Sequence, residues 1–331
     1  MTMSRSRGAR LLAVAAVVAL GVTACSGGGK AKTTDSTSGG GNAAGSSGYT
    51  IAMITHETPG DTFWDKIKAG AQQAAKDTGV TLKYSNDPDA SKQAVLIQNA
   101  VDSKVNGIAT TLVTPDALAG AVKSAIAAKI PVVGFNSGIE QYKQLGALMF
   151  FGSDETLAGT TAGQRLATEG AKHTLCVIQQ AGSVALEARC AGVKSAIPGT
   201  ENIQVNGADD SAVTSTLQAK LSQDKSIDSI VTLGAPQALD AIKALDASGS
   251  KAKLVTFDLN QQAAQDIQDG KIDFSIDQQP YVQGYMAVTS LYLYLKNGND
   301  IGGGKAVLTG PSFVDKSNIA TILPFTKNNT R

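Results

Sequence analysis

The sequence predicts an α/β fold made of two open, mainly parallel sheets in series. From Tyr49 onward, short β-branched runs alternate with longer segments of helical spacing. The starts of these runs lie about 25 to 30 residues apart, which is the period of repeated βα units. About 280 residues follow residue 48, which is enough for two ordinary domains. A single sheet of about ten strands is the less usual alternative.

The first series of elements runs from residue 49 to residue 136. Phe63, Ile67 and Ala71 recur on one face of a helix, and Pro115 suits the first turn of another. The elements expected, in order, are strand 49–55, a helix from 63, strand 80–85, helix 91–103, strand 107–113, helix 115–129 and strand 131–136.

The second series begins near Gly152 and repeats the same alternation. Its strands include the β-branched runs "TLCVIQQ", "SIVTL" and "KLVTFD". The elements expected, in order, are helix 155–169, strand 174–180, helix 184–197, strand 203–206, helix 211–222, strand 229–233, helix 236–247, strand 253–258, helix 261–269, strand 271–277 and a final helix 281–295.

The amino-terminal residues 1–24 predict an export signal that takes no part in the fold. Arginines at positions 5, 7 and 10 precede the uncharged apolar run 11–20, which is too short to span a bilayer. The stretch Val22-Thr23-Ala24-Cys25 resembles the lipobox of bacterial lipoproteins, so Cys25 is expected to carry lipid. An ordinary signal peptide with a chance cysteine is the alternative.

Residues 25–48 are expected to form a disordered tether. They are almost all Gly, Ser, Thr, Ala and Asn, a composition that buries too little apolar surface to order itself. A tether behind an acylated cysteine places a globular body outside the cytoplasm, near the outer face of the cell membrane.

Charge and cysteine content exclude several classes of protein. Removing residues 1–24 takes away three of the 29 basic side chains and none of the 28 acidic ones, and no basic block remains to hold nucleic acid. An exported chain meets an oxidising compartment, so Cys176 and Cys190 are expected to form a disulfide, one from a strand and one from the following helix. Two buried free thiols are the alternative. His56 and His173 are the only histidines, and no metal site or cofactor is expected.

The familiar motifs of enzyme chemistry are missing. "THETPGDTF" lacks the glycine pattern of a dinucleotide site, and Gly302-Gly303-Gly304-Lys305 departs from a phosphate loop at Asn299 and Ala306. No Gly-x-Ser-x-Gly elbow is present. The chain is therefore expected not to be an enzyme.

Ligands of open parallel sheets bind outside the carboxyl ends of the strands. The side chains that the sequence places there are mostly uncharged hydrogen-bonding groups, which suit a neutral, hydroxyl-rich molecule. They are His56, Glu57, Asn136, Ser137, Gln179, Gln180, Asp258, Asn260 and Gln278.

Five segments together resemble a known family. They are "FWDKIKAGAQQAAKDTGV", "KQAVLIQNAVDSKVNGIATTLVTPDAL", "KIPVVGFNSG", "FGSDETLAG" and "VTFDLNQQAAQDIQDGKIDFSIDQQPYVQGYMAV". The chain resembles the ribose-binding-protein-like, type I periplasmic binding proteins, which are the sugar receptors of ABC importers. The resemblance covers 49–295 and implies two Rossmann-like lobes, 49–152 plus 279–308 and 153–278 plus 309–325, joined by a three-stranded hinge.

The resemblance also implies ligand-binding roles. Phe63 and Trp64 would stack on a sugar ring, with core packing as the alternative for one of them. Arg189, Asp258 and Gln278 match the family's binding arginine, cleft aspartate and hinge glutamine; their alternatives are a surface helix arginine, a helix N-cap and a plain polar hinge residue.

Three places depart from the family or are ambiguous. Asn136 and Ser137 stand where many relatives have an Asp-Arg pair, and Gly234-Ala235 replace a frequent Asn-Asp. His56 would donate to the ligand or face solvent.

The expected function is a monomeric lipoprotein that captures a small neutral sugar or polyol for the membrane permease of an ABC importer. A sugar sensor for a signalling receptor and, less favoured, a secreted carbohydrate-active enzyme are the alternatives.

Overall fold

The structure, a computed structural model, describes residues 45–331. The predicted signal peptide 1–24, the predicted lipid attachment site Cys25 and most of the predicted tether lie outside the described residues. Within the end of that tether, the backbone N–H of Ser47 donates to the carbonyl of Gly79 at 2.8 Å. The body of the protein therefore begins slightly before Tyr49.

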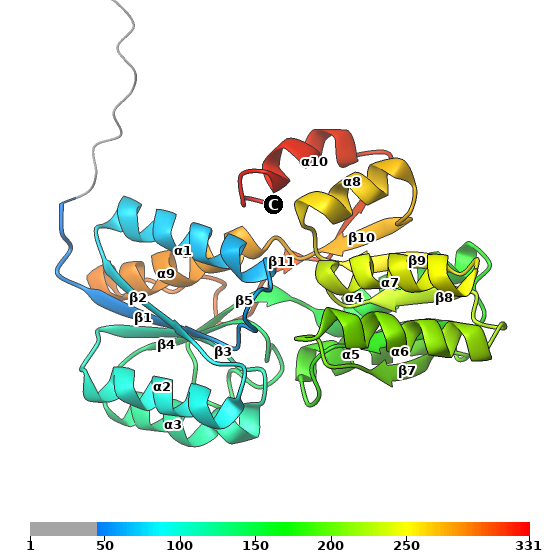
Figure 1. Ribbon diagram of the computed structural model, residues 1–331. Coiled ribbons are helices and arrows are strands. Elements are labelled where there is room, and N and C mark those ends of the chain that lie inside the picture. The colour runs from blue at the N-terminus through cyan, green and yellow to red at the C-terminus, as the bar shows by residue number, and fades with distance from the viewer. Residues whose placement is uncertain (1–44) are drawn as a thin grey trace, which may run out of the picture. The chain divides into compact units, whose positions relative to one another are not determined.

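The first of two sheets has the strand order β11-β5-β4-β3-β1-β2, with parallel pairing throughout. Helices α1 and α9 cover one face and α2 and α3 the other (Figure 1). We call this sheet and these helices the first lobe. The elements are β1 Thr50–Thr55, α1 Phe63–Thr78, β2 Thr81–Asn86, α2 Ala90–Asp102, β3 Gly107–Thr111, α3 Pro115–Ala127, β4 Val132–Asn136, β5 Met149–Ser153, α9 Pro280–Asn297 and β11 Val307–Gly310.

The second sheet has the order β12-β10-β9-β8-β6-β7. Helices α4 and α5 pack on one face, and α6, α7, α8 and α10 on the other. We call these elements the second lobe. They are α4 Glu155–Thr168, β6 Thr174–Ile178, α5 Val184–Ala196, β7 Glu201–Gln204, α6 Asp210–Gln223, β8 Ser229–Thr232, α7 Ala235–Ser248, β9 Lys253–Phe257, α8 Gln261–Asp269, β10 Phe274–Asp277, β12 Ser312–Asp315 and α10 Ile319–Thr326.

The predicted fold of two α/β sheets is confirmed, and the alternative of one ten-stranded sheet is wrong. Sheet membership shows that the chain passes between the lobes three times, after β5, after β10 and between β11 and β12. One pairing departs from the parallel pattern, because β12 runs antiparallel to β10.

Four elements were not predicted: β5, β11, β12 and α10. The three strands have four or five residues each, and the cis peptide bond Gly310-Pro311 separates β11 from β12. Helix α10 contains Pro324, which is a signal against a helix interior. Pairing with neighbouring strands, rather than local pattern, holds the short strands in place.

Glycines allow two helix pairs to pack with their backbones in contact. A β-carbon at Gly70 of α1 would collide with the carbonyl of Tyr281 in α9, and one at Gly159 of α4 would collide with the carbonyl of Arg189 in α5. Each pair carries residues that the sequence proposed for the ligand site, Phe63 and Trp64 on α1 and Arg189 on α5.

Cys176 of β6 and Cys190 of α5 form the predicted disulfide, with their Cα atoms 5.8 Å apart. The bridge ties the helix that carries Arg189 to β6, the strand next to the edge strand β7 of the second sheet. The alternative of two free thiols is wrong.

Candidate ligand-binding cleft

A cavity of about 650 Å³ lies where the carboxyl ends of the strands of both lobes face each other. Seven of the eight side chains proposed from the sequence line it: His56, Phe63, Trp64, Asn136, Arg189, Asp258 and Gln278. They are far apart in the sequence and come from both sheets, so the fold alone brings them together.

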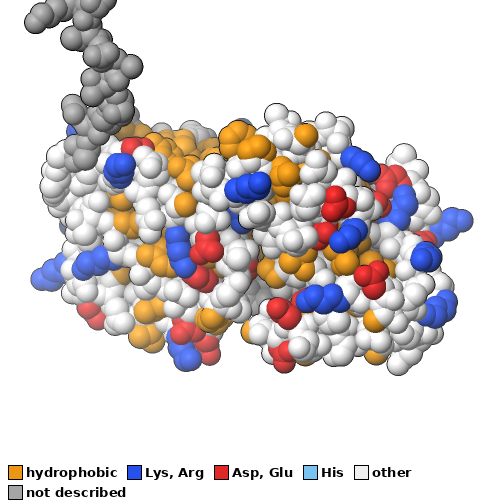
Figure 2. Space-filling view, turned by 45° about the horizontal axis from the view of Figure 1, so that its top comes forward, with side chains coloured by type: hydrophobic (Ala, Val, Ile, Leu, Met, Phe, Trp, Pro, Cys, Tyr) orange, Lys and Arg blue, Asp and Glu red, His pale blue; other side chains and the backbone are white. Residues whose placement is uncertain are grey.

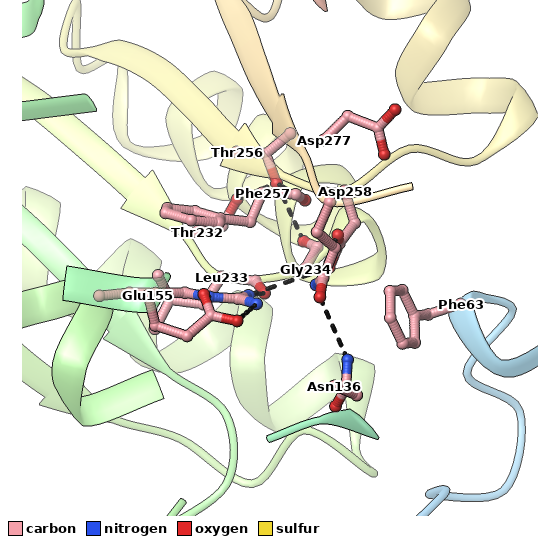
Figure 3. Close-up of polar contacts among 12 residues, drawn as sticks. Phe63, Asn136, Glu155, Thr232, Leu233, Gly234, Thr256, Phe257, Asp258 and Asp277 are labelled. Carbon is pink, nitrogen blue, oxygen red and sulfur yellow. Dashed lines mark hydrogen bonds and ion pairs between the residues drawn. The ribbon is translucent and has the colours of Figure 1, made fainter. Parts of the chain in front are cut away.

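Arg189 lies in the wall that the second lobe contributes, with only 3% of its surface exposed. Its Nε and Nη2 donate to the two carboxylate oxygens of Glu155 at 2.6 and 3.1 Å, and Nη1 donates to the carbonyl of Leu233 at 3.2 Å (Figure 3). The guanidinium also lies 4.5 Å from the ring centre of Phe257. Because a guanidinium carries five N–H donors, two remain for a ligand. The surface-arginine alternative is therefore wrong.

Glu155 holds Arg189 in position and was missed from the sequence. It is the first residue of α4 and only 3% exposed. Burial raises the pKa of its carboxyl, while the charge of Arg189 opposes that rise. No local signal distinguishes Glu155 from an ordinary acidic residue in a first helical turn.

Asp258 follows β9 with a left-handed backbone, at φ 63°. Its Oδ1 accepts from Nε2 of Gln278 at 2.9 Å, and its Oδ2 lies 4.0 Å from Nη1 of Arg189. Burial raises the pKa of Asp258 to about 7, against the opposing charge of Arg189. The helix N-cap alternative is wrong, since Asn260 caps α8 through its own side chain.

His56, Phe63 and Trp64 form the aromatic part of the cavity wall. The Trp64 ring meets both neighbours edge to face, with centroids 4.7 Å from His56 and 5.2 Å from Phe63. Nδ1 of His56 lies 2.8 Å from Oγ1 of Thr111. Burial lowers the pKa of His56 to about 3, so the ring is neutral at physiological pH.

Phe63 and Trp64 are both buried in the core and both line the cavity. Core packing and cavity lining are therefore not alternatives here. In Figure 3, Phe63 lies beside Asp258 and Asn136.

Asn136 and Gln278 link the two lobes at the base of the cavity. Nδ2 of Asn136 donates to Oε1 of Gln278 at 3.1 Å and to Oε1 of Gln283 at 3.3 Å. The amide of Gln278 thus accepts from the first lobe while it donates to Asp258 in the second. Gln278 is a lobe-connecting group as well as a cavity residue.

Ser137 is the one proposed site residue that does not line the cavity. Asn136 has a left-handed φ of 63°, and the backbone N–H of Ser137 donates to the carbonyl of Phe135 at 2.7 Å. This tight turn places Ser137 in the interior, where it is 1% exposed.

The cavity also receives residues that were not proposed as site residues, among them Asp61, Gln179, Asn206 and Gln237. Gln179 stands at the carboxyl end of β6, a position that the sequence marks as facing ligand. Gln237 lies inside a helix, where no such signal exists.

Away from the cavity, His173, Glu201 and Asp224 place one potential metal-ligand atom each within 4.8 Å of one another. The ammonium of Lys220 lies 2.8 Å from Glu201 and 3.8 Å from Asp224, so a side-chain cation already pairs with these carboxylates.

Residues 51–300 match the model of the periplasmic binding protein domain family. The chain belongs to this family. The match covers most of the chain and agrees with the two-lobed fold.

Named relatives of this periplasmic binding protein are solute-binding proteins, not enzymes. It is 28% identical to the xylose/arabinose-binding protein XylF of Sulfolobus acidocaldarius, over 83% of this chain and 73% of the relative. It is also 28% identical to the ribose import binding protein RbsB of Salmonella typhimurium, over 70% and 79% of the two chains.

A solved structure is more similar. A carbohydrate transporter from Acidothermus cellulolyticus, in complex with myo-inositol, shares 57% identity with this binding protein, with a TM-score of 0.84. The match covers 86% of this chain and 99% of the other.

Proposed function

We propose that this binding protein captures a neutral cyclic polyol or monosaccharide, with myo-inositol the first candidate, and delivers it to the permease of an ABC importer. The observation that carries the proposal is the wall of the cavity, where amides, one guanidinium and the carboxyl of Asp258 share the lining with the aromatic rings of Phe63 and Trp64. The lining also includes Asp61, Asp209 and Asp210. The relative with 57% identity, crystallised with myo-inositol, supports the choice of ligand.

The chemistry of the wall fits a polyhydroxylated ring. The free donors of Arg189 and the carboxyl of Asp258 suit hydroxyl groups at the ring edge, while Phe63 and Trp64 suit its C–H faces. A hydroxyl of the wrong configuration leaves a buried polar group unpaired, at a cost of about 1 to 3 kcal/mol. Selectivity among stereoisomers follows from that cost.

We propose that the two lobes move as rigid units whose bounds lie close to the predicted ones, 49–152 plus 279–308 and 153–278 plus 309–325. Strand β5 and strand β11 belong whole to the first unit. Ligand binding between the two units favours the closed arrangement, as in other hinged binding proteins.

We further propose that Cys25 carries a lipid and anchors the protein outside the cytoplasm. Among the described residues, none of the helices is long and apolar enough to cross a bilayer. Changing Cys25 to serine should move the protein from the membrane fraction to the soluble fraction. A Cys25→Ser protein that stays membrane-bound would argue against the anchor.

The ligand is tested by a thermal-shift panel of myo-inositol, D-ribose, D-xylose, L-arabinose and D-galactose, with amino acids and purines as controls. A ligand at 100 times its Kd stabilises the folded state by about 2.7 kcal/mol. Fluorescence gives a second readout, because Trp64 is the chain's single tryptophan and lines the cavity. A response to amino acids or purines, with none to polyols or sugars, would contradict the proposal.

A further inference from the structure

Two amide side chains converge over a glycine in the wall of the second lobe. Gly234 follows β8 and precedes α7, with an extended backbone. A β-carbon at this position would lie 2.7 Å from Oε1 of Gln237 and 3.2 Å from Nε2 of Gln179. Both amides therefore occupy the space that any other residue at position 234 would fill.

Gln237 is buried and Gln179 is half-buried, and neither side chain uses all of its hydrogen-bonding groups within the described residues. Gln237 is 5% exposed, and its side chain makes no hydrogen bond with another residue in 45–331. Oε1 of Gln179 is buried and also lacks a partner within that range. Buried polar groups are normally paired, so the unpaired oxygen of Gln179 and the unbonded amide of Gln237, both next to Gly234, call for an occupant or a function.

The pair adjoins the part of the wall already described. Gln179 and Gln237 both line the cavity. Arg189 donates to the carbonyl of Leu233, the residue before Gly234, and Figure 3 shows Leu233 and Gly234 beside the Glu155 contact of that arginine. A ligand held by Arg189 thus has the two amides next to it.

We propose that Gln179 and Gln237 form a second hydroxyl-binding subsite over Gly234. It binds the ring hydroxyls that Arg189 and Asp258 do not contact. The subsite rests on the proposed polyol function. Each amide offers two donors and one acceptor, so it pairs with a hydroxyl in either direction. The subsite is neutral, which matches an uncharged polyol.

The test replaces each amide by a side chain of similar length, in Gln179→Met and Gln237→Met. Gln218→Met, on the exposed face of α6, is the matched control. Calorimetry with myo-inositol, or with whichever neutral polyol or sugar binds the wild type best, should show about tenfold weaker binding for each variant. The control should bind like the wild type.

Gly234→Ala tests whether the two amides must occupy the space next to position 234 for the ligand to bind. Its methyl group displaces the amides without removing them, and an extended backbone accepts alanine. Affinity should fall about as far as in the methionine variants, while the melting temperature without ligand stays close to that of the wild type. If Gln237→Met does not fold, Gln237→Asn keeps the amide but shortens its reach and serves instead.

The outcomes separate the two proposals. A wild type that binds a polyol while both methionine variants keep its affinity within about twofold would overturn the subsite and leave the function standing. Variants that lose unliganded stability but not affinity would make the amides structural and also overturn it. A wild type that binds no neutral polyol or sugar would overturn both.

Discussion

Asp258 and His56 are both buried in the cavity wall, yet burial acts on them in opposite directions. Loss of water disfavours the charged form of each, which raises the pKa of the carboxyl to about 7 and lowers that of the imidazole to about 3. His56 is therefore neutral at physiological pH, whereas Asp258 changes charge close to it. Binding should depend on pH through the carboxyl, not through the histidine.

We expect the affinity for a polyol to increase as pH rises through about 7, because the charged carboxylate of Asp258 accepts more strongly from a hydroxyl. Stability of the unliganded protein should respond in the opposite sense. The folded pKa lies above the unfolded value of about 3.9, so the stability present below that value is lost as pH rises through 7. Calorimetry and denaturant unfolding below and above pH 7 measure both effects.

Asp258→Asn is the control for this pH dependence, since the amide does not titrate. The difference between wild type and variant should isolate the carboxyl. A wild-type affinity that stays flat across pH 7, or an equal slope in Asp258→Asn, would assign the titration to another group.

Arg189 and Glu155 form a buried ion pair, so the loss of either charge should change stability as well as ligand binding. Arg189→Met leaves the buried carboxyl of Glu155 without its partner, so we expect the free energy of unfolding to fall by about 3 to 5 kcal/mol. The double change Arg189→Met with Glu155→Gln should recover part of that loss, measured by denaturant unfolding, but not ligand affinity. Recovery of binding would show that the guanidinium does not contact the ligand.

At the scale of elements, two glycine-bearing helix pairs position the cavity wall. Backbones of α1 and α9 touch at Gly70, and those of α4 and α5 touch at Gly159. A methyl group at either glycine fits only if a whole helix moves, because backbone atoms, not flexible side chains, lie in its path. Glu155 and Arg189 meet across the α4–α5 pair.

We predict that Gly159→Ala destabilises the protein by about 1 to 3 kcal/mol or more, because the new methyl pushes α4 from α5. The same shift should weaken ligand binding by moving Glu155 away from Arg189. Gly120→Ala in α3 is the matched control, since nothing lies within 4 Å of its added methyl group. That change should stabilise the helix by about 0.5 to 1 kcal/mol. Equal melting temperatures for the two variants would contradict the close-contact argument.

For the molecule as a whole, hydrogen bonds tie together the chain segments that pass between the lobes. Oγ1 of Thr309 donates to the carbonyl of Gln278 at 2.7 Å and lies 3.1 Å from Nε2 of Gln283. Nε2 of Gln279 donates to the carbonyl of Thr309 at 2.7 Å. Because Gln278 also bonds Asp258 and Asn136, the cavity floor and the crossing segments form one connected network.

Thr309→Val tests that network at a residue that does not line the cavity. We expect a loss of about 1 to 3 kcal/mol in stability from the missing hydroxyl contacts. We also expect a change in ligand affinity, since the balance between open and closed lobes shifts. Small-angle X-ray scattering with and without ligand measures that balance, and Thr168→Val on the exposed side of α4 is the control. Scattering and affinity equal to those of the wild type would limit Thr309 to a local role.

Charges of both signs are mixed on the face of the molecule drawn in Figure 2, where Lys and Arg side chains are interspersed with Asp and Glu.

The sequence by itself determined the alternation of strands and helices, the two series of βα units and the polar residues at the carboxyl ends of strands. These follow from periodicity and from the geometry of parallel sheets, which are local properties. The strand and helix that hold Cys176 and Cys190 were predictable for the same reason.

Only the tertiary structure decided which side chains meet. Strands β5, β11 and β12 were not predicted from the local sequence and are held by pairing with neighbouring strands. Arg189 donates to Glu155, and the amides of Gln179 and Gln237 both lie next to Gly234. No local sequence pattern indicates either arrangement. Ser137 turns away from the cavity because of the backbone turn at Asn136. Contacts of this kind depend on how whole helices and sheets pack, so periodicity predicts the elements and packing determines the site.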